Sequence, residues 1–203
     1  MHDRGRDGYS AAMFGTYNPV QSLPLTVVTP HLVIQGNLQT RLRQLTDVLN
    51  EPSAEHLILF DATFMEVGSR RVVAGPAVAQ IQLGDVLFVH ANAATESGGE
   101  MRMPKQQIRA IVLAPPFTIE GEIHLPFEAE LHQALDGFGG RFVPIMKARY
   151  WAYGVAESPN YVDLLALNHA RVHIAVPVGV EWHKESTPDG GSGGGSDGGQ
   201  NPW

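Results

Sequence analysis

Residues 33–38 read Val-Ile-Gln-Gly-Asn-Leu, and residues 118–123 read Thr-Ile-Glu-Gly-Glu-Ile. Each run is typical of a strand with a glycine at its centre. Three further pairs of stretches match in the same order, namely 45–49 with 131–135, 59–64 with 145–150, and 81–86 with 165–170. The first residue of each later stretch minus the first residue of its earlier match gives offsets of 85, 86, 86 and 84 residues. Collinear matches at a near-constant offset predict an internal duplication.

The two predicted units share one order of elements, which begins with a strand and a helix. The strand spans residues 31–38 in the first unit and 117–123 in the second. A short amphipathic helix follows, because Leu45, Val48 and Leu49 share one face of a 3.6-residue period. In the second unit Pro126 suits the first turn of the corresponding helix, and the glycines at 137, 139 and 140 end it.

A second strand and a hairpin complete each predicted unit. The strand spans residues 56–64 and 142–153. The hairpin turn is Gly84-Asp85 in the first unit and Asn168-His169 in the second. Gly and Asn tolerate the positive φ that tight hairpin turns require.

These elements predict an α+β fold of two tandem repeats, each a mainly antiparallel small sheet or barrel with one short helix. Whether the units share one sheet or form two barrels stays open. The predicted boundaries are a flexible N-terminal arm at residues 1–24, repeat units at 25–100 and 101–183, and a disordered Gly/Ser-rich tail at 184–203.

Part of the first unit resembles an uncharacterised bacterial domain family. The resemblance rests on Gly36-Asn37-Leu38, on residues 43–50 (Arg-Gln-Leu-Thr-Asp-Val-Leu-Asn) and on Asp61-Ala62. The family pattern has a glycine-bearing strand, an Arg-Leu-x-Asp-x-Leu-Asn-like helix and a Leu-x-Asp-Ala strand, and the helix here is one residue longer than that motif. Since the family has no assigned activity, the resemblance implies a small α+β module and transfers no catalytic residues.

Composition restricts the function classes. The chain has 203 residues and a formal net charge of -7, which argues against a dedicated binder of nucleic acid or of anionic membranes. It has no cysteine, which excludes disulfides, thiolate zinc sites and a cysteine nucleophile. The N-terminus lacks the apolar core of a signal peptide, and no apolar run has the length of a membrane span, so we expect a cytoplasmic protein that does not insert into membranes.

The histidines suggest a metal site that their spacing does not support. His169 and His173 flank Arg171 on a predicted strand, and no carboxylate stands at ligand spacing beside them. His124 and His132 flank the second predicted helix without a third partner. We therefore expect polar stripes at these positions, with no metal and no cofactor.

Two carboxylates and five basic residues are the remaining candidates for a catalytic or binding site. Asp47 and Asp61 lie in the most strongly patterned part of the first unit, but their repeat partners are Gln133 and Lys147, which favours a structural role over acid–base catalysis. A basic patch would need the fold to gather five side chains, which are Arg70, Arg71, Arg102, Lys105 and Arg109. No aromatic residues alternate with them in the manner of single-strand binders, so a solvated face is expected.

The C-terminus ends in Asn201-Pro202-Trp203 after a Gly/Ser-rich stretch. A tryptophan at the end of a tether has no folding role in this pattern, so Pro202 and Trp203 are the predicted partner-binding residues. The sequence favours a non-enzymatic interaction or structural protein that assembles with itself or with partner chains through sheet edges and this tail. The alternatives are a regulatory module that binds a small ligand or nucleic acid between the units, and an enzyme with an unrecognised site.

Overall fold

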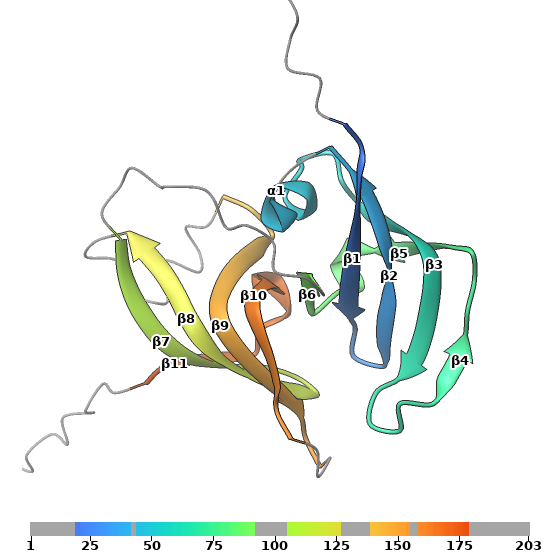
Figure 1. Ribbon diagram of the computed structural model, residues 1–203. Coiled ribbons are helices and arrows are strands. Elements are labelled where there is room, and N and C mark those ends of the chain that lie inside the picture. Colours follow the sequence, from blue (N-terminus) through green and yellow to red (C-terminus); the bar gives the residue numbers. More distant parts are fainter. Residues whose placement is uncertain (1–18, 42–43, 92–104, 127–138, 155–157, 179–203) are drawn as a thin grey trace, which may run out of the picture.

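The computed structural model describes residues 19–41, 44–91, 105–126, 139–154 and 158–178 (Figure 1). These residues form one antiparallel sheet of eleven strands in the order β11-β7-β8-β9-β10-β6-β1-β2-β3-β4, with β5 also paired to β3. The strands are β1 (Gln21–Val28), β2 (Leu32–Thr40), β3 (His56–Glu66), β4 (Val72–Ala74), β5 (Val78–Gln82), β6 (Phe88–Ala91), β7 (Lys105–Ala114), β8 (Phe117–Pro126), β9 (Phe142–Ala152), β10 (Asn160–Asn168) and β11 (Ile174–Pro177). We call β1–β6 the first group and β7–β11 the second group.

The expected α+β class is wrong, because the structure is a β-sheet protein. Helical structure in the described part of the chain is limited to α1 (Leu45–Leu49) and two 3-10 turns, η1 (Leu83–Asp85) and η2 (His169–Arg171). The sheet is continuous and curls twice, once in each group, so it encloses most of its own core and needs no layer of helices (Figure 1). The predicted second helix falls in residues 127–138, which lie outside the described residues.

The structure does not establish the predicted duplication. β4 pairs with β3 in the first group and has no described counterpart in the second, and the second helix is not among the described residues. β1 begins at Gln21, inside the predicted arm, and residues 1–18 are outside the described part. Individual local features nevertheless recur in both groups.

The two central glycines sit opposite matching irregularities in the sheet. The β2–β3 register shifts between Gln35 and Asn37, around Gly36, and Asp61 on β3 has φ 50°. A Cβ atom at Gly36 would lie 3.1 Å from the carbonyl oxygen of Phe60. A glycine is therefore needed where the two backbones approach, and such a bulge increases the local bend of the strand.

The same arrangement recurs in the second group. The β8–β9 register shifts between Glu120 and Glu122, around Gly121, and Lys147 on β9 has φ 48°. A Cβ atom at Gly121 would lie 2.9 Å from the carbonyl oxygen of Met146. Both curls of the sheet therefore depend on a glycine facing a bulged strand.

The predicted hairpins at residues 84–85 and 168–169 are wrong. Each site forms a 3-10 turn that sends the following strand away from the preceding one. β5 pairs with β3, whereas β6, which follows η1, pairs with β1 on one side and with β10 on the other. A two-residue hairpin would have kept the two strands adjacent, whereas the bond from Val86 N–H to the Leu83 carbonyl (3.3 Å) closes a three-residue turn.

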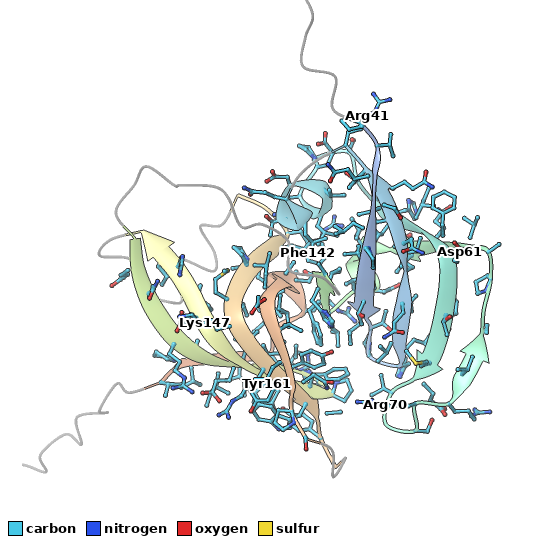
Figure 2. The ribbon with its side chains drawn as sticks, viewed as in Figure 1. Arg41, Asp61, Arg70, Phe142, Lys147 and Tyr161 are labelled. Atoms are coloured by element: carbon cyan, nitrogen blue, oxygen red, sulfur yellow. The ribbon has the colours of Figure 1, made fainter. Side chains whose placement is uncertain are left out.

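The two groups share their cores. Phe88 of β6 is fully buried in the core of the second group, with its ring centroid 5.3 Å from that of Phe117 and 4.9 Å from that of Tyr150. In return, Phe142 of β9 is buried in the core of the first group, beside α1 (Figure 2). The Asn50 side chain at the end of α1 donates to the carbonyl of Phe142 (2.8 Å) and accepts from its N–H (2.7 Å). We therefore expect the two groups to unfold together.

Replacing Gly121 with alanine should lower the free energy of unfolding by about 1–3 kcal/mol, because the added methyl group would overlap β9. Gly84→Ala is the matched control, since nothing lies within 4 Å of its added Cβ, and it should change stability by less than about 0.5 kcal/mol. Urea unfolding followed by tryptophan fluorescence measures both. Equal stability of the two variants would contradict the close approach at the bulge.

Candidate functional site

A cavity of about 260 Å³ lies between the two groups of strands. Its walls come from β1, β2, β3 and β6 on one side and from β8, β9 and β10 on the other. Arg70, in the turn between β3 and β4, borders it from the first group (Figure 2). The remaining polar side chains of the lining are Thr26, Gln35, Glu66, His90, Tyr150, Ser158 and Asn160. The cavity is large enough for a small polar molecule.

His90 and Tyr150 form a buried pair at the wall of this cavity. The His90 Nε2 atom lies 3.0 Å from the Tyr150 hydroxyl, and Nδ1 lies 3.4 Å from the Ala91 carbonyl oxygen. A neutral imidazole satisfies both contacts when its Nδ1–H donates to Ala91 and its Nε2 accepts from the tyrosine hydroxyl. The contact joins β6 of the first group to β9 of the second.

Burial keeps both members of the pair neutral near pH 7. It lowers the pKa of His90 below 6.5, although the hydrogen bond to the Ala91 carbonyl opposes this shift. It raises the pKa of Tyr150 to about 12, against the charge of Arg70. A neutral tyrosine with so high a pKa is not a nucleophile. Because its proton is donated to His90, the Tyr150 oxygen can still accept a hydrogen bond from a polar ligand.

A second polar cluster lies across β7, β8 and β9. Glu120 of β8 accepts hydrogen bonds from Arg149, one of them from Nε at 2.6 Å, and forms an ion pair with Arg109. Burial alone would raise the pKa of the Glu120 carboxyl, but the two arginines outweigh burial and hold it below its ordinary value. Next to it, Lys147 Nζ lies 3.0 Å from Glu122 Oε2. Each of the three cations of this face contacts one of two carboxylates, which neutralise most of the positive charge that a phosphate would need.

The described residues of the five basic candidates do not gather into one surface. Arg70 borders the cavity between the groups, whereas Arg109 pairs with Glu120 on another face. Arg71 pairs with Glu66, with Nη2 3.5 Å from Oε2. Arg102 lies outside the described residues, as does the side chain of Lys105.

The candidate histidines are dispersed. His169 belongs to η2, His173 is exposed just before β11, and His124 lies on β8. His132 is outside the described residues. Within the part of the chain that the structure describes, no three His, Asp or Glu side chains come close enough to hold a metal ion.

The two candidate aspartates do not line the cavity. Asp47 is exposed on α1. Asp61 is exposed on β3 at the bulge (Figure 2), where its N–H donates to the carbonyl of Ala77 (2.8 Å). Asp is among the few residue types that tolerate positive φ, so the backbone explains this residue. Sequence reasoning missed His90 and Tyr150 because they lie sixty positions apart and only the pairing of β6 with β10 brings them together.

The two ends of the sheet carry exposed apolar side chains. At one end Val72, Val73 and Val78 on β4 and β5 are each more than half exposed. At the other end Ile174 of β11 is 50% exposed, and Val178 follows it. No strand among the described residues pairs with the outer side of β5 or of β11.

Pro202 and Trp203, the predicted partner-binding residues, lie outside the described residues. No helix in the described ranges is long and apolar enough to cross a membrane. Comparison with family models, with curated proteins and with solved structures returns no match for this chain. The resemblance to an uncharacterised bacterial domain family therefore stays a prediction.

The pair of His90 and Tyr150 should limit stability at both ends of the pH range. Because the pKa of His90 is lowered in the folded state, its contribution is complete above pH 6.5 and is lost as the pH falls through the folded pKa. Because the pKa of Tyr150 rises from 10.0 to about 12, its contribution is complete below pH 10.0 and is lost as the pH rises toward 12. His90→Gln should reduce the loss of stability between about pH 7 and pH 5.

Urea unfolding at a series of pH values measures this effect. The exposed His56→Gln variant is the control and should keep the wild-type profile. An acid profile that His90→Gln leaves unchanged would show that burial does not disfavour the imidazolium.

Proposed function

We propose that this protein is a non-enzymatic assembly protein, which joins copies of itself or partner chains through the ends of its sheet and its C-terminal segment. The observation that carries the proposal is the pair of open sheet ends with valines on β4 and β5 and isoleucine on β11. Open edges present unpaired N–H and C=O groups, and proteins that stay monomeric usually blunt them with charge, bulges or coverage. Exposed apolar side chains at such edges favour association.

The charged residues of the described part support the same proposal. Arg109, Arg149 and Lys147 are held by Glu120 and Glu122, so this face contributes no strong positive field toward nucleic acid. The cavity between the groups holds a neutral Tyr–His pair and lacks an activated nucleophile. An assembly role therefore accounts for more of the structure than catalysis does.

Sedimentation over a range of concentrations tests the proposal. The full chain should show an average mass above its monomer mass of 22.0 kDa. A Val73→Lys/Val78→Lys variant should shift toward the monomer, because it places charges on an apolar sheet end. The control is Tyr153→Lys, which alters a similarly exposed side chain outside the end strands.

The same sedimentation experiment tests the role of the C-terminal segment. Removing residues 187–203, or changing Trp203 to Ala, should leave the free energy of unfolding unchanged and weaken association. A full chain that stays at 22.0 kDa at every concentration, and a truncated chain that likewise stays at its own monomer mass, would contradict assembly with itself.

The cavity favours a second candidate function, the binding of a small neutral ligand. Its lining offers the hydroxyl oxygen of Tyr150 and the amide groups of Gln35 and Asn160, which come from both groups of strands. A hydroxyl-rich molecule such as a nucleoside or monosaccharide matches these groups in size and polarity. Ligand binding here would stabilise the contact between the two groups.

Thermal melting with a panel of nucleosides and monosaccharides tests the second candidate. A ligand present at about 100 times its Kd should raise stability by about 2.7 kcal/mol. Ser158→Trp, which fills the rim of the cavity, should abolish the shift. If no compound of the panel raises the melting temperature of the wild type, the cavity is not a site for this class.

A further inference from the structure

The junction between the two groups is the pairing of β6 with β10, the one strand pairing between the groups among the described residues. β6 pairs with β10 over three residue pairs, with Val89 opposite Ala166 at the centre. The N–H of Asn168 donates to the carbonyl of Leu87 (2.9 Å). The buried Asn168 side chain donates to the carbonyl of Val86 (2.9 Å), next to η1. Phe88 fills the second core, as described above.

β11 is built like β6. Each strand follows a 3-10 turn and pairs antiparallel with the first strand of its group. The residue before each strand makes the same backbone bond, from Leu87 N–H to the Val28 carbonyl (2.8 Å) and from His173 N–H to the Leu113 carbonyl (2.9 Å). β6 uses its outer side to hold β10, whereas the outer side of β11 pairs with no described strand.

β5 is built like β10. Each strand precedes a 3-10 turn and pairs with the bulged strand of its group. The first residue of each turn makes the same bond, from Leu83 N–H to the Glu55 carbonyl (2.9 Å) and from His169 N–H to the Arg141 carbonyl (3.2 Å). The chain therefore carries both partners of its own junction a second time, on β5 and β11.

The backbone groups at these two edges point outward at the required positions. The bond from Val178 N–H to the Arg109 carbonyl fixes the alternation on β11, so the N–H and C=O of Ala175 face away from β7. On β5, the bond from Leu83 N–H to the Glu55 carbonyl fixes the alternation of the backbone groups in the same way. The N–H and C=O of Gln80 therefore face away from β3. Gln80 and Ala175 occupy the places that Ala166 and Val89 occupy in the internal junction.

Two side-chain positions at the edges also correspond to positions of the internal junction, although Gln80 is an exposed polar residue at the place of the buried Ala166. Ile174 holds the place of Phe88, but it is 50% exposed, whereas Phe88 is fully buried in the core of the other group. Gln82 holds the place of Asn168 and is exposed. Beside β11 of a second copy, the Gln82 amide would lie near the carbonyls of that copy's η2, as the Asn168 amide lies near those of η1. Pro177, which lacks an N–H, corresponds to Ala91, which is outside the three-pair ladder.

The residues that would receive Ile174 lie at the margin of the first core. In the second group Phe117 and Tyr150 enclose the Phe88 ring. Leu32 and Phe64 hold the corresponding places in the first group, judged by their pairings with β3 and β2. Both are only half-buried and pack at the margin of that core.

We propose that a second copy of this chain docks on the sheet head to tail, with β11 of one copy added antiparallel to β5 of the next and Ala175 opposite Gln80. The inference rests on the proposed assembly function and names its partner and register. Because β5 and β11 are different surfaces, the contact is heterologous, and repetition produces a closed ring or an open filament. A continuous sheet then runs through every copy.

Two proline variants each prevent strand pairing at one edge of the sheet. Gln80→Pro removes an outward N–H of β5, and Ala175→Pro removes an outward N–H of β11. Neither N–H donates to a neighbouring strand within the chain. By light scattering of the full chain, each variant alone should fall to 22.0 kDa. Because each variant keeps one intact edge, an equal mixture should form a pair with twice that mass.

Matched variants control for folding and for charge. Gln80→Ala and Ala175→Ser keep the N–H groups and should assemble like the wild type. Ile174→Glu should prevent assembly without unfolding, whereas Val20→Glu, at a similarly exposed residue outside both end strands, should not. Circular dichroism of each variant should retain the β-sheet spectrum.

The outcomes separate this inference from the proposed function. If the wild type assembles and the variants at residues 80, 174 and 175 assemble equally well, the head-to-tail contact is overturned. Assembly through another surface then remains. Loss of assembly in Gln80→Pro with no effect of Ala175→Pro shows a symmetric contact of β5 with β5 and also overturns it. A wild type that stays at 22.0 kDa overturns both self-assembly and the inference.

Cysteine cross-linking tests the register in a chain that has no cysteine of its own. Directly opposite, hydrogen-bonded residues have Cα atoms about 5.5 Å apart, within the range of about 4.4–6.8 Å that a disulfide spans. A Gln80→Cys/Ala175→Cys variant should form covalent multimers on mild oxidation. The Gln80→Cys/Val178→Cys control, displaced by roughly 10 Å along the strand, should not. Equal cross-linking of both variants would overturn the register.

Discussion

The rest of the structure depends on β6, a four-residue strand that belongs to two cores at once. Its backbone pairs with β1 on one side and with β10 on the other. Its Phe88 side chain points into the second core, while Val89 points into the first. Successive side chains of a strand face opposite sides of a sheet, so one short strand can serve both cores only because the sheet curls in opposite senses about it. The two groups are thereby one structural unit.

This shared strand also positions the polar features between the groups. His90 can reach the hydroxyl of Tyr150 only because β6 lies beside β10, which brings β9 within one strand of it. The same arrangement forms the cavity, which has one wall from each group. At the opposite side of the junction, the double hydrogen bond between Asn50 and the backbone of Phe142 ties α1 to β9. Polar contacts on both sides of β6 thus restrict rotation of one group against the other.

Local parts of the fold could be predicted where the signal lies within a few residues. The strands around Gly36 and Gly121, and the strands that begin at His56 and Phe142, lie close to their predicted positions. No strand is expected from the sequence at β1 or β7, although apolar residues recur at every second position in both, namely Leu23, Leu25 and Val27 in β1 and Ile108, Ala110 and Val112 in β7. The turns at Gly84 and Asn168 were misassigned, since the same residue types suit a hairpin and a 3-10 turn, and only the destination of the next strand distinguishes them.

The amino-acid sequence by itself determined the strands around Gly36 and Gly121 and those that begin at His56 and Phe142. It also determined where a glycine stands in the sheet and that the chain has no cysteine chemistry. Those properties follow from side-chain periodicity, from the absence of a Cβ atom and from composition, which are local or additive. Tertiary structure alone decided the β-sheet class, the pairing of β6 with β10, the cavity with His90 and the exposure of Ile174. These depend on which strand edges meet after the chain has bent twice. No periodic pattern encodes that choice, because the energy of a strand pair comes from two segments that are distant in the chain.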